Sequence, residues 1–445
     1  MDNNNNRNNQ SSPLHLRRKK RGIFDRPQKK STPIEKKHTP HNDRPTGATA
    51  PSAPETRTAS RRIPDAAKAV QRDTVPVSPD KVRKSGVGTI VLRVVAMFMT
   101  FVLMIVLTLV ISLKMICSDI SPAAKNTFVT TLLETGQLKF LASMFVPEDE
   151  IQKIVDGNTM EEMKDEVDSS LISININNAG QNNSGNSGGT NADRPDIEVI
   201  EISGRTYYGT LLIIKDPSRV SLASIYKQNG NSWPAQGVTL DKLVTDSGAV
   251  AGMNSGLYDS SNNSGGRPFG IVVADGEIQL NAPQSYEGLV LIGFDENHIL
   301  QIIDVDGMTA AETKAMIEEK GIRDAVTFQE EATDKNNHFV KLVINGKARE
   351  MNGAGSGLNP RTCIGQCADG SILMLVTDGR GKDGHLGASA SDLIGIMMEY
   401  GAVNAANLDG GSSSCMYYED EYLMTSVTFY YSNESWRMPT AFVVK

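Results

Sequence analysis

The most hydrophobic stretch of the chain predicts one membrane-spanning helix. Residues 94–113 contain no charged side chain and are bounded by Arg93 and Lys114. A helix of this length spans about 30 Å, the thickness of the hydrocarbon core of a bilayer. The apolar run is too long, and the basic region before it too large, for a cleaved signal peptide. We therefore expect a retained single-pass anchor at residues 89–116.

Three segments around this anchor have patterns that differ from that of a globular domain. Residues 1–88 are rich in Asn, Pro, Ser, Lys and Arg and show no apolar period, so they predict a disordered tail. Residues 117–176 carry leucines at helical spacing and Thr159-Met160-Glu161-Glu162, which resembles a capping box, so they predict a helical stalk. The Asn, Gly and Ser of residues 177–195 are typical of a flexible linker.

The remaining residues, 196–445, alternate short strand-like runs with turn signals. Asp275-Gly276, Asn345-Gly346 and Asp369-Gly370 each join two such runs. These dipeptides favour the positive φ angles of tight hairpins, so they indicate antiparallel pairs. The strand-like runs are 208–215, 269–273, 289–294, 340–343 and 372–376.

Two helices are also expected in this domain. One runs from Thr309 to Gly321 and the other from Ser389 to Gly401, and each has a capping side chain at its start and a glycine at its end. The predicted fold is therefore α+β, with a mixed, largely antiparallel sheet core and a few packed helices, preceded by one transmembrane helix.

The net charge of the whole chain, −7, conceals a division at the anchor. Residues 1–93 carry 21 Lys and Arg against 8 Asp and Glu, a net charge of +13, and the rest carries 24 against 44, or −20. The positive-inside rule places the basic N-terminus in the cytoplasm and the acidic C-terminal domain outside the cell membrane. An acidic domain also argues against nucleic acid as its ligand, because phosphate backbones bind to net basic faces.

Cysteine and histidine do not define a disulfide scaffold or a metal site. Four cysteines in 445 residues are too few for a disulfide-stabilised fold. Cys363 and Cys367 would lie about 13 Å apart in an extended strand, too far to bridge each other, and a bond from either to Cys415 stays open. The histidines of the domain have no ligand spacing, so we expect no metal or other cofactor, although acidic residues and carbonyls leave Ca²⁺ binding open.

Three polar clusters interrupt the apolar runs and are the candidates for chemistry. In the first, Asn254 follows an apolar approach and precedes Ser255-Gly256. Its amide can donate to and accept from sugar hydroxyls or a phosphate. The alternative is a turn amide that bonds to its own backbone.

The second cluster begins at the start of an apolar strand. Arg361, within Pro360-Arg361-Thr362, is a permanent charge among apolar neighbours. Such a charge indicates either an anionic ligand held bidentately or a structural ion pair with a buried carboxylate. Asp378, followed by Gly379-Arg380, ends the next strand, where sites are often assembled, although the same Asp-Gly pair also suits a plain turn.

The third cluster, Asn407-Leu408-Asp409-Gly410-Gly411-Ser412, places a carboxylate at the end of an apolar run, before glycines and hydroxyls. Backbone N–H groups exposed beside an acid suit the close approach of a polar substrate, whereas the alternative is a glycine-rich surface turn. No Gly-Lys-Ser/Thr follows, so the cluster is unlike a nucleotide P-loop.

In their order along the chain, these clusters resemble the phosphodiester glycosidase domain family, which includes an N-acetylglucosamine-1-phosphodiester α-N-acetylglucosaminidase and bacterial proteins linked to exopolysaccharides. The resemblance spans about residues 200–445, and Asn-Leu-Asp-Gly-Gly is its specific motif. Ser255 and Ser412 stand where the family has glycine and Leu257 where it has an aromatic residue, which concerns substrate preference rather than fold. The matching motifs are Asn254–Tyr258, Pro360–Gly365, Asp378–Arg380, Gly401–Ser413 and Arg437–Ala441.

The resemblance implies hydrolysis of a sugar-1-phosphodiester. A phosphate leaving group needs little proton donation but does need positive charge, which Arg361, Arg380 or Arg437 can supply. An oxocarbenium-like transition state also needs a carboxylate nearby, and the roles of Asp378 and Asp409 stay open. The expected catalytic residues are Asp378, Asp409 and Arg361. The expected substrate-binding residues are Asn254, Gly256, Thr362, Arg380, Gly410, Gly411, Ser412 and Arg437.

We therefore expect a bacterial, membrane-anchored, extracellular hydrolase that cleaves sugar-1-phosphodiester links in cell-surface glycopolymers and acts on an N-acetylglucosamine-like sugar. Its expected partners are a carbohydrate or sugar-phosphate polymer and, through the 94–113 helix, the membrane. Two other classes stay open: a non-catalytic glycopolymer-binding or envelope-assembly module, and a metal-dependent phosphodiesterase that cuts the P–O bond. Turnover, binding without turnover, and sensitivity to a chelator distinguish the three.

Overall fold

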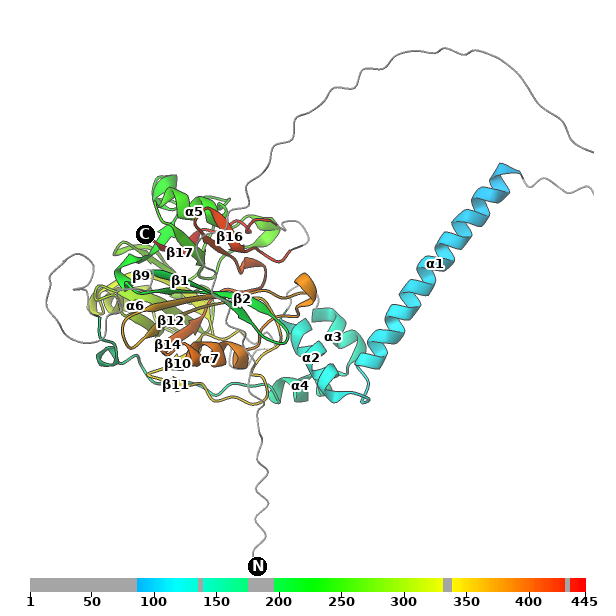
Figure 1. Ribbon diagram of the computed structural model, residues 1–445, viewed down its shortest axis with the longest axis horizontal. Coiled ribbons are helices and arrows are strands. Elements are labelled where there is room, and N and C mark those ends of the chain that lie inside the picture. The colour runs from blue at the N-terminus through cyan, green and yellow to red at the C-terminus, as the bar shows by residue number, and fades with distance from the viewer. Residues whose placement is uncertain (1–85, 135–138, 175–195, 331–337, 429–432) are drawn as a thin grey trace, which may run out of the picture. The chain divides into compact units, whose positions relative to one another are not determined.

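A computed structural model describes residues 86–134, 139–174, 196–330, 338–428 and 433–445. The predicted linker, 177–195, and nearly all of the predicted tail lie outside these residues. The described chain holds three antiparallel sheets and seven α-helices, which confirms the predicted α+β fold (Figure 1).

The helix α1 (Val87–Ile116) contains the predicted membrane span. It has 30 residues, a mean hydropathy of 3.0 over its most apolar window, and no residue buried against other parts of the protein. It is therefore long and apolar enough to cross a membrane.

The region after α1 is helical only in its first part. Its helices are α2 (Pro122–Leu133), α3 (Lys139–Phe145) and α4 (Glu148–Asp156), which share a small core that includes Val129, Ala142 and Ile151. The prediction that Thr159 starts a helix is wrong. The chain is extended there, and Met160 forms an antiparallel bridge with Met351 of the domain, so tertiary pairing overrides the local motif.

The largest sheet has seven strands in the order β1-β2-β13-β12-β14-β10-β11. The predicted hairpins form at both Asp369-Gly370 and Asn345-Gly346, where Gly370 and Gly346 have positive φ. The strands are β1 (Ile197–Ser203), β2 (Tyr208–Ile214), β10 (Lys341–Ile344), β11 (Lys347–Ala348), β12 (Arg361–Cys367), β13 (Ile372–Thr377) and β14 (Ala402–Asn407).

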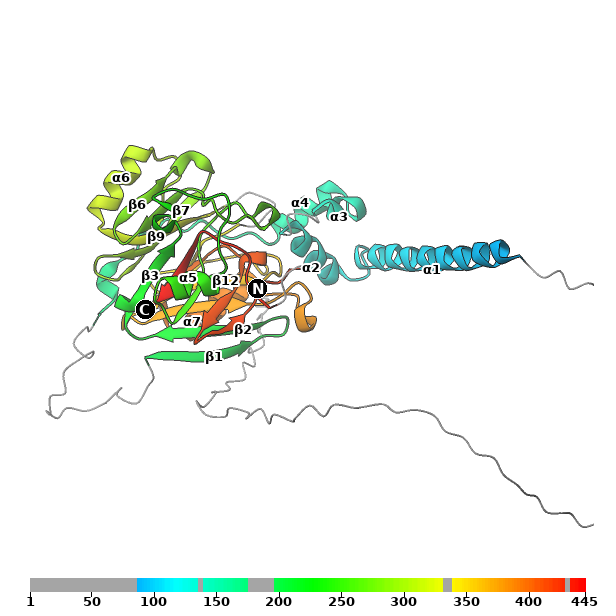
Figure 2. The ribbon, with the colours of Figure 1, turned by 90° about the horizontal axis from the view of Figure 1, so that it is seen from above.

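Two five-stranded sheets complete the domain, and one of them is seen with α6 (Ala310–Glu319) on its outer side in Figure 2. That sheet has the order β6-β5-β9-β7-β8, and its Asp275-Gly276 hairpin forms as predicted. Its strands are β5 (Ile271–Ala274), β6 (Glu277–Asn281), β7 (Leu289–Asp295), β8 (Leu300–Asp304) and β9 (Ile322–Gln329). The other sheet, β16-β15-β4-β17-β3, consists of β3 (Val220–Ser224), β4 (Ala251–Asn254), β15 (Met416–Tyr418), β16 (Glu421–Met424) and β17 (Thr440–Val444).

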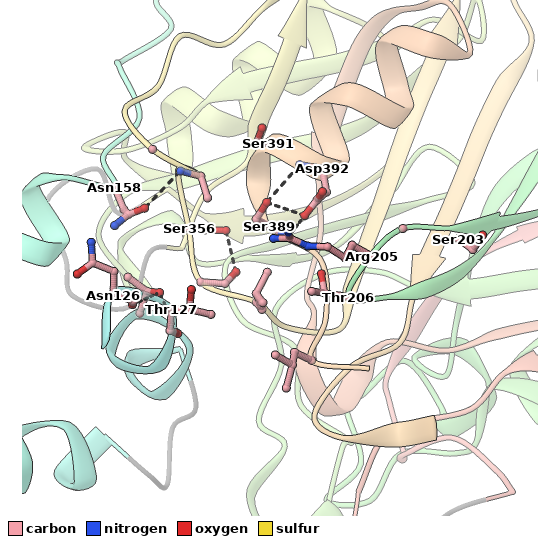
Figure 3. A pocket seen from close by; sticks show the side chains of 17 residues that line it. Asn126, Thr127, Asn158, Ser203, Arg205, Thr206, Ser356, Ser389, Ser391 and Asp392 are labelled. Carbon is pink, nitrogen blue, oxygen red and sulfur yellow. Dashed lines mark hydrogen bonds between the residues drawn. The ribbon is translucent and has the colours of Figure 1, made fainter. Parts of the chain in front are cut away.

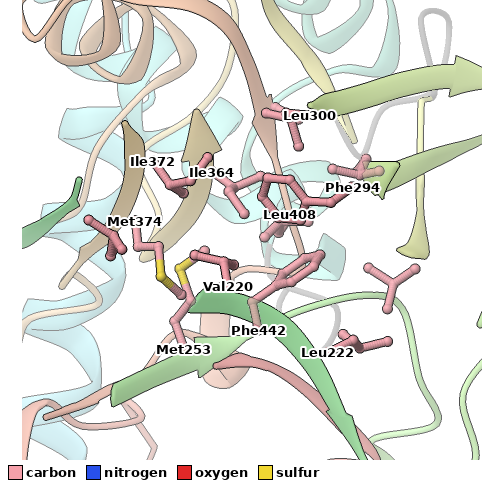
Figure 4. Close-up of a cluster of buried hydrophobic side chains, with 14 of the residues drawn as sticks. Val220, Leu222, Met253, Phe294, Leu300, Ile364, Ile372, Met374, Leu408 and Phe442 are labelled. Carbon is pink, nitrogen blue, oxygen red and sulfur yellow. The ribbon is translucent and has the colours of Figure 1, made fainter. Parts of the chain in front are cut away.

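One hydrophobic core joins all three sheets. Met253 and Phe442 come from one sheet, Ile364 and Met374 from the seven-stranded sheet, and Phe294 from the third, and all five side chains are fully buried (Figure 4). Burial of apolar area at this junction is the main favourable term of folding. It also fixes the ends of β4, β12 and β14 beside one another.

Local signals place the domain's other helices. Both α6 and α7 (Ala390–Glu399) start with the predicted capping boxes, at Thr309 and Ser389. Both are followed by the expected glycine in the left-handed region, Gly321 and Gly401. The helix α5 (Leu240–Asp246) buries Leu240, Leu243 and Val244 in a cluster with side chains of β17.

Candidate functional site

The two predicted carboxylates lie at one edge of the seven-stranded sheet. Strands β13 and β14 both pair with β12 in antiparallel fashion, so they run in the same direction and end at the same edge. Thr377 lies opposite Arg361, and Asn407 lies opposite Cys363. Asp378 directly follows β13 and Asp409 follows β14 after Leu408, on either side of β12. Two strand spacings place their backbones about 10 Å apart.

Asn254, the last residue of β4, connects the sheet that contains β4 to this edge of the seven-stranded sheet. Its Nδ2 donates to the carbonyl oxygen of Asp409 at 2.6 Å. Its Oδ1 accepts from the hydroxyl of Thr362 at 2.8 Å and from the N–H of Cys415 at 3.1 Å. The amide therefore holds the Asp409 loop against β4 and β12 and does not bond its own turn.

Asp409 is a partly exposed acid in a polar setting. Its surroundings raise its pKa to about 6: burial is the largest cause, and the Ser413 hydroxyl and the charges of His338 and Arg380 act in the opposite direction. Ser413 in turn shares a hydrogen bond of 3.0 Å with the hydroxyl of Tyr258. A carboxyl with such a pKa exchanges its proton close to neutral pH, which suits acid–base chemistry.

Arg380 supplies an exposed positive charge beside Asp409. Its Nε donates to Oδ1 of Asn359 at 3.0 Å and its Nη1 to the hydroxyl of Ser412 at 2.8 Å. A Cβ on Gly411 would lie 2.5 Å from Nη2, and Gly411 has a φ of +61°. Only glycine therefore permits this close packing of the guanidinium on the loop.

Asp378 is paired with a histidine that the sequence did not single out as a partner. Its Oδ1 accepts from the N–H of Tyr208 and its Oδ2 lies 2.7 Å from Nδ1 of His385. The aspartate is 3% exposed, whereas the histidine side chain is 31% exposed. From the sequence, His385 is considered only as a metal ligand. Six residues, which include the short 3-10 turn Lys382–Gly384, separate it from Asp378, so no periodic pattern reveals the pair.

Arg361 forms the structural ion pair that the sequence left as one of two alternatives. Its Nη2 donates to Oε2 of Glu134, at the end of α2, and to the carbonyl oxygen of Gly357 at 3.0 Å. The guanidinium also lies 4.9 Å from the centre of the Phe339 ring. Burial raises the pKa of Glu134 to about 6, and the charge of Arg361 counteracts this shift.

The structure brings together most of the residues expected to bind substrate. Gly410 lies against β12, because a Cβ there would be 2.9 Å from the carbonyl oxygen of Pro360. Gly256 instead packs on β9, where a Cβ would be 2.6 Å from the Val326 side chain. Arg437 is exposed and its Nη1 donates to the carbonyl oxygen of Gly237; within the described residues, no hydrogen bond or ion pair joins it to the other candidates.

The described residues contain no group of three or more His, Cys, Asp and Glu side chains that could hold a metal ion. All four cysteines belong to the described part of the chain, and each is a free thiol. Burial raises the pKa of the Cys363 and Cys415 thiols far above neutral, so both are inert core side chains.

Comparison with known proteins gives a family match and several distant likenesses. Residues 247–445 match the family model described as phosphodiester glycosidase. An uncharacterised protein of the Bacillus subtilis prophage SPbeta, YomE, is 37% identical over 65 residues, which are 15% of this chain and 10% of that protein.

Two solved structures are distantly similar to this chain. One is the zebrafish N-acetylglucosamine-1-phosphodiester α-N-acetylglucosaminidase catalytic domain, auto-inhibited by its pro-peptide, with 14% identity, a TM-score of 0.42, and coverage of 57% of this chain and 84% of that one. The other is described as an exported protein of Burkholderia pseudomallei, with 17% identity, a TM-score of 0.35, and coverage of 55% and 74%. The family match alone therefore bears on chemistry.

Proposed function

Because residues 247–445 belong to the phosphodiester glycosidase family, we propose that this chain hydrolyses the bond between the anomeric carbon of a sugar and a phosphodiester oxygen. The observation that supports this proposal most strongly is the meeting of Asp409 and Arg380 at one exposed edge, held by Asn254 and Ser412. An acid that titrates near neutral pH and a fixed cation are the two groups that this reaction needs.

Arg380 has the role of the phosphate-binding group. The leaving group of the reaction is a phosphate monoester, which is already a weak base and needs charge stabilisation rather than a proton. The guanidinium is held by Asn359 and Ser412, so it meets the developing charge without reorganisation.

Asp409 has the role of general base. In this step a water oxygen forms a bond to the anomeric carbon, the bond from that carbon to the phosphate oxygen breaks, and the water proton passes to the Asp409 carboxylate. The products are a free sugar and a phosphate monoester. The Ser413 hydroxyl and the Asn254 amide hold the loop that carries Asp409.

Asp378 and Arg361 act through other groups. Asp378 is a positioning residue that fixes the ring of His385 by its hydrogen bond to Nδ1 and leaves Nε2 for the substrate phosphate. Arg361 is a positioning residue for α2, because its guanidinium is taken up by Glu134 and Gly357.

The proposed setting is the outer face of a bacterial cell membrane, and the proposed substrates are cell-surface glycopolymers with sugar-1-phosphate links. The support for this setting is the apolar helix α1, preceded by a basic segment and followed by an acidic one. A domain tethered in this way lies beside such polymers.

The proposal is tested by release of free N-acetylglucosamine from UDP-N-acetylglucosamine and from a methyl phosphodiester of N-acetylglucosamine 1-phosphate. We expect turnover by the wild-type chain and a fall of at least about 10³-fold in kcat for Asp409→Ala, since both proton transfer and charge stabilisation are lost. The control is Asp165→Ala, which removes a carboxylate that is 55% exposed and has one surface ion pair.

Three outcomes contradict parts of the proposal. Equal turnover by wild type and Asp409→Ala removes Asp409 from the site. Tight binding of the diester without turnover shows a binding module instead of an enzyme. Loss of turnover in a chelator, with recovery on addition of Ca²⁺, shows metal-dependent cleavage.

A further inference from the structure

A cavity of about 850 Å³ separates helix α2 from the domain. Figure 3 shows Asn126 and Thr127 of α2 on one side, with Arg205, Ser389 and Asp392 on the other. The volume falls within the range of known small-molecule sites, about 300–1,000 Å³. None of the residues proposed above to carry the chemistry lines this cavity.

The wall of the cavity combines polar groups with apolar surface and is nearly neutral. Hydroxyl and amide side chains dominate its lining, with Arg205 as the lining cation. Asp392 is already engaged, because its Oδ2 accepts from the N–H and the hydroxyl of Ser389 at 2.8 and 2.7 Å. Uncharged hydroxyls and amides bind ligands that both donate and accept hydrogen bonds, as sugars do.

The N-terminus of α7 opens on this cavity but does not form an anion site. The N–H of Ala390 donates to the Ser356 hydroxyl at 2.9 Å, and the N–H of Ser391 donates to the carbonyl oxygen of Ala354 at 3.1 Å. The Asp392 N–H donates to the Ser389 hydroxyl. With these donors in use, the cavity favours a neutral hydroxylated ligand over a phosphate.

Two stretches of backbone connect the cavity to the proposed catalytic edge. Leu386 lines the cavity and directly follows His385, and its carbonyl oxygen accepts from the N–H of Arg380 at 3.1 Å. Ser356 and Gly357 form another part of the wall, and both accept from Nη2 of Arg361. The cavity is therefore bounded by the same backbone segments that carry His385 and hold Arg361.

Helix α2 is fixed in the position that closes the cavity. Glu134, at its end, accepts from Arg361 and from the N–H of Gly357, and Thr131 accepts from the N–H of Leu358. Because Glu134 is 2% exposed, this junction is a buried interface and not a loose surface contact. The segment after α1 therefore contributes one wall of the cavity.

We infer that the cavity between α2 and the domain binds a neutral sugar unit of a polymeric substrate, next to the linkage that is cleaved. The inference rests on the proposed function and deepens it, since it makes a glycopolymer and not an isolated sugar diester the preferred substrate. Asn126 and Ser391 supply groups that can donate to and accept from this sugar unit. Thr127 and Thr206 supply acceptors, because their hydroxyls donate to the carbonyl oxygens of Ala123 and Gly387.

The test uses substitutions that place a large side chain in the cavity at its exposed rim. Ser391→Trp and Asn126→Trp replace exposed side chains on opposite walls, and Ser143→Trp, on the exposed surface of α3, is the matched control. The substrates are a hexamer of N-acetylglucosamine joined by 1-phosphodiester links and the methyl diester of N-acetylglucosamine 1-phosphate. We expect KM for the hexamer to rise at least about tenfold in both cavity variants, with kcat/KM for the methyl diester unchanged.

A direct binding measurement keeps the inference separate from the catalytic proposal. Chitotetraose, a neutral tetramer of N-acetylglucosamine, is titrated calorimetrically into the full chain in detergent. We expect binding to wild type and to Ser143→Trp, and its loss in both cavity variants, even if no diester is hydrolysed. Equal chitotetraose binding by all variants, or an equal loss of activity on both substrates, overturns the inference.

Discussion

Asp409 illustrates a conflict between stability and chemistry at a single residue. Its pKa is raised to about 6 chiefly because the folded protein removes water from the carboxylate. A raised pKa means that the folded state holds the proton more tightly than the unfolded state. The stability that this group contributes is therefore fully present below about pH 4 and is lost as pH rises through about 6. The ionised form, which the proposed base step needs, is the less stable one.

This conflict predicts the pH dependence of the proposed reaction. If ionised Asp409 is the base, kcat/KM for a sugar-1-phosphodiester rises about tenfold per pH unit below pH 6 and becomes constant above it. Initial rates of sugar release between pH 4.5 and 8 measure this profile. Asp409→Asn is expected to remove the inflection together with most of the rate.

The opposite profile contradicts the assigned role. A rate that is highest below pH 6 and falls above it means that the protonated carboxyl acts as an acid. Asp165→Asn, which changes an exposed carboxylate outside the site, is expected to keep the wild-type profile.

The candidate residues that the sequence reveals are those whose chemistry is unusual for their local context. Asp409 follows an apolar run and precedes two glycines, and the structure places it beside Arg380 and Ser412. His385 and Glu134 were missed, because each gains its significance from a partner that no local pattern indicates. Glu134 lies 227 residues before Arg361, and only the folded chain brings the two together.

At the scale of elements, the junction between α2 and β12 is held by one buried charge pair. The side chains of Arg361 and Glu134 are 8% and 2% exposed. Removal of one member of such a pair leaves an uncompensated buried charge, which typically costs about 3–5 kcal/mol. Loss of the Arg361 guanidinium is therefore expected to destabilise the junction.

Arg361→Met tests this account of the junction. We expect the free energy of unfolding to fall, by up to about 3–5 kcal/mol at a pH where Glu134 is ionised without a partner. Because the charge of Arg361 lowers the pKa of Glu134, its removal raises that pKa above about 6, so the loss is expected to be smaller at pH 5, where Glu134 is protonated, than at pH 7. Urea unfolding at pH 5 and pH 7 measures both effects.

A second substitution separates a structural role of Arg361 from a catalytic one. Arg361→Met combined with Glu134→Leu removes both buried charges and is expected to recover most of the stability, and sugar release with it. Arg267→Met, at an exposed arginine, is the control and is expected to unfold like wild type. A double variant that is stable but inactive contradicts the positioning role, and so does a single variant as stable as the control.

The elements that could be predicted are those specified by contiguous residues. The capping boxes at Thr309 and Ser389 and the hairpin at Asp275-Gly276 formed as expected, since their hydrogen bonds lie within a few residues. The motif at Thr159 failed because the segment gains more from pairing with the domain, through Met160 and Met351, than from a helical turn. The order of strands in the sheets depends on distant partners and left no local signal.

At the scale of the whole molecule, the charge division and helix α1 together predict one orientation of the chain across a membrane. The first 93 residues carry +13 and the rest −20, and α1 lies at the boundary. Basic segments beside a span stay in the cytoplasm, so the acidic domain with the proposed site is expected outside. Such an arrangement presents the proposed catalytic edge to surface polymers and not to cytoplasmic nucleotide sugars.

Membrane fractionation and protease accessibility test this arrangement on the full chain in a bacterial host. We expect the chain in the membrane fraction, resistant to extraction with carbonate, and a chain that begins at residue 118 to be extracted into the soluble fraction. External protease added to spheroplasts is expected to digest the domain and to spare a tag on the N-terminus. If the domain is protected until the membrane is dissolved, the orientation is reversed; if the shortened chain stays in the membrane, α1 is not the anchor. The first result places the proposed site away from the polymers it is expected to cleave. The second means attachment by another route than a spanning helix, because no other described helix is long and apolar enough to cross a bilayer.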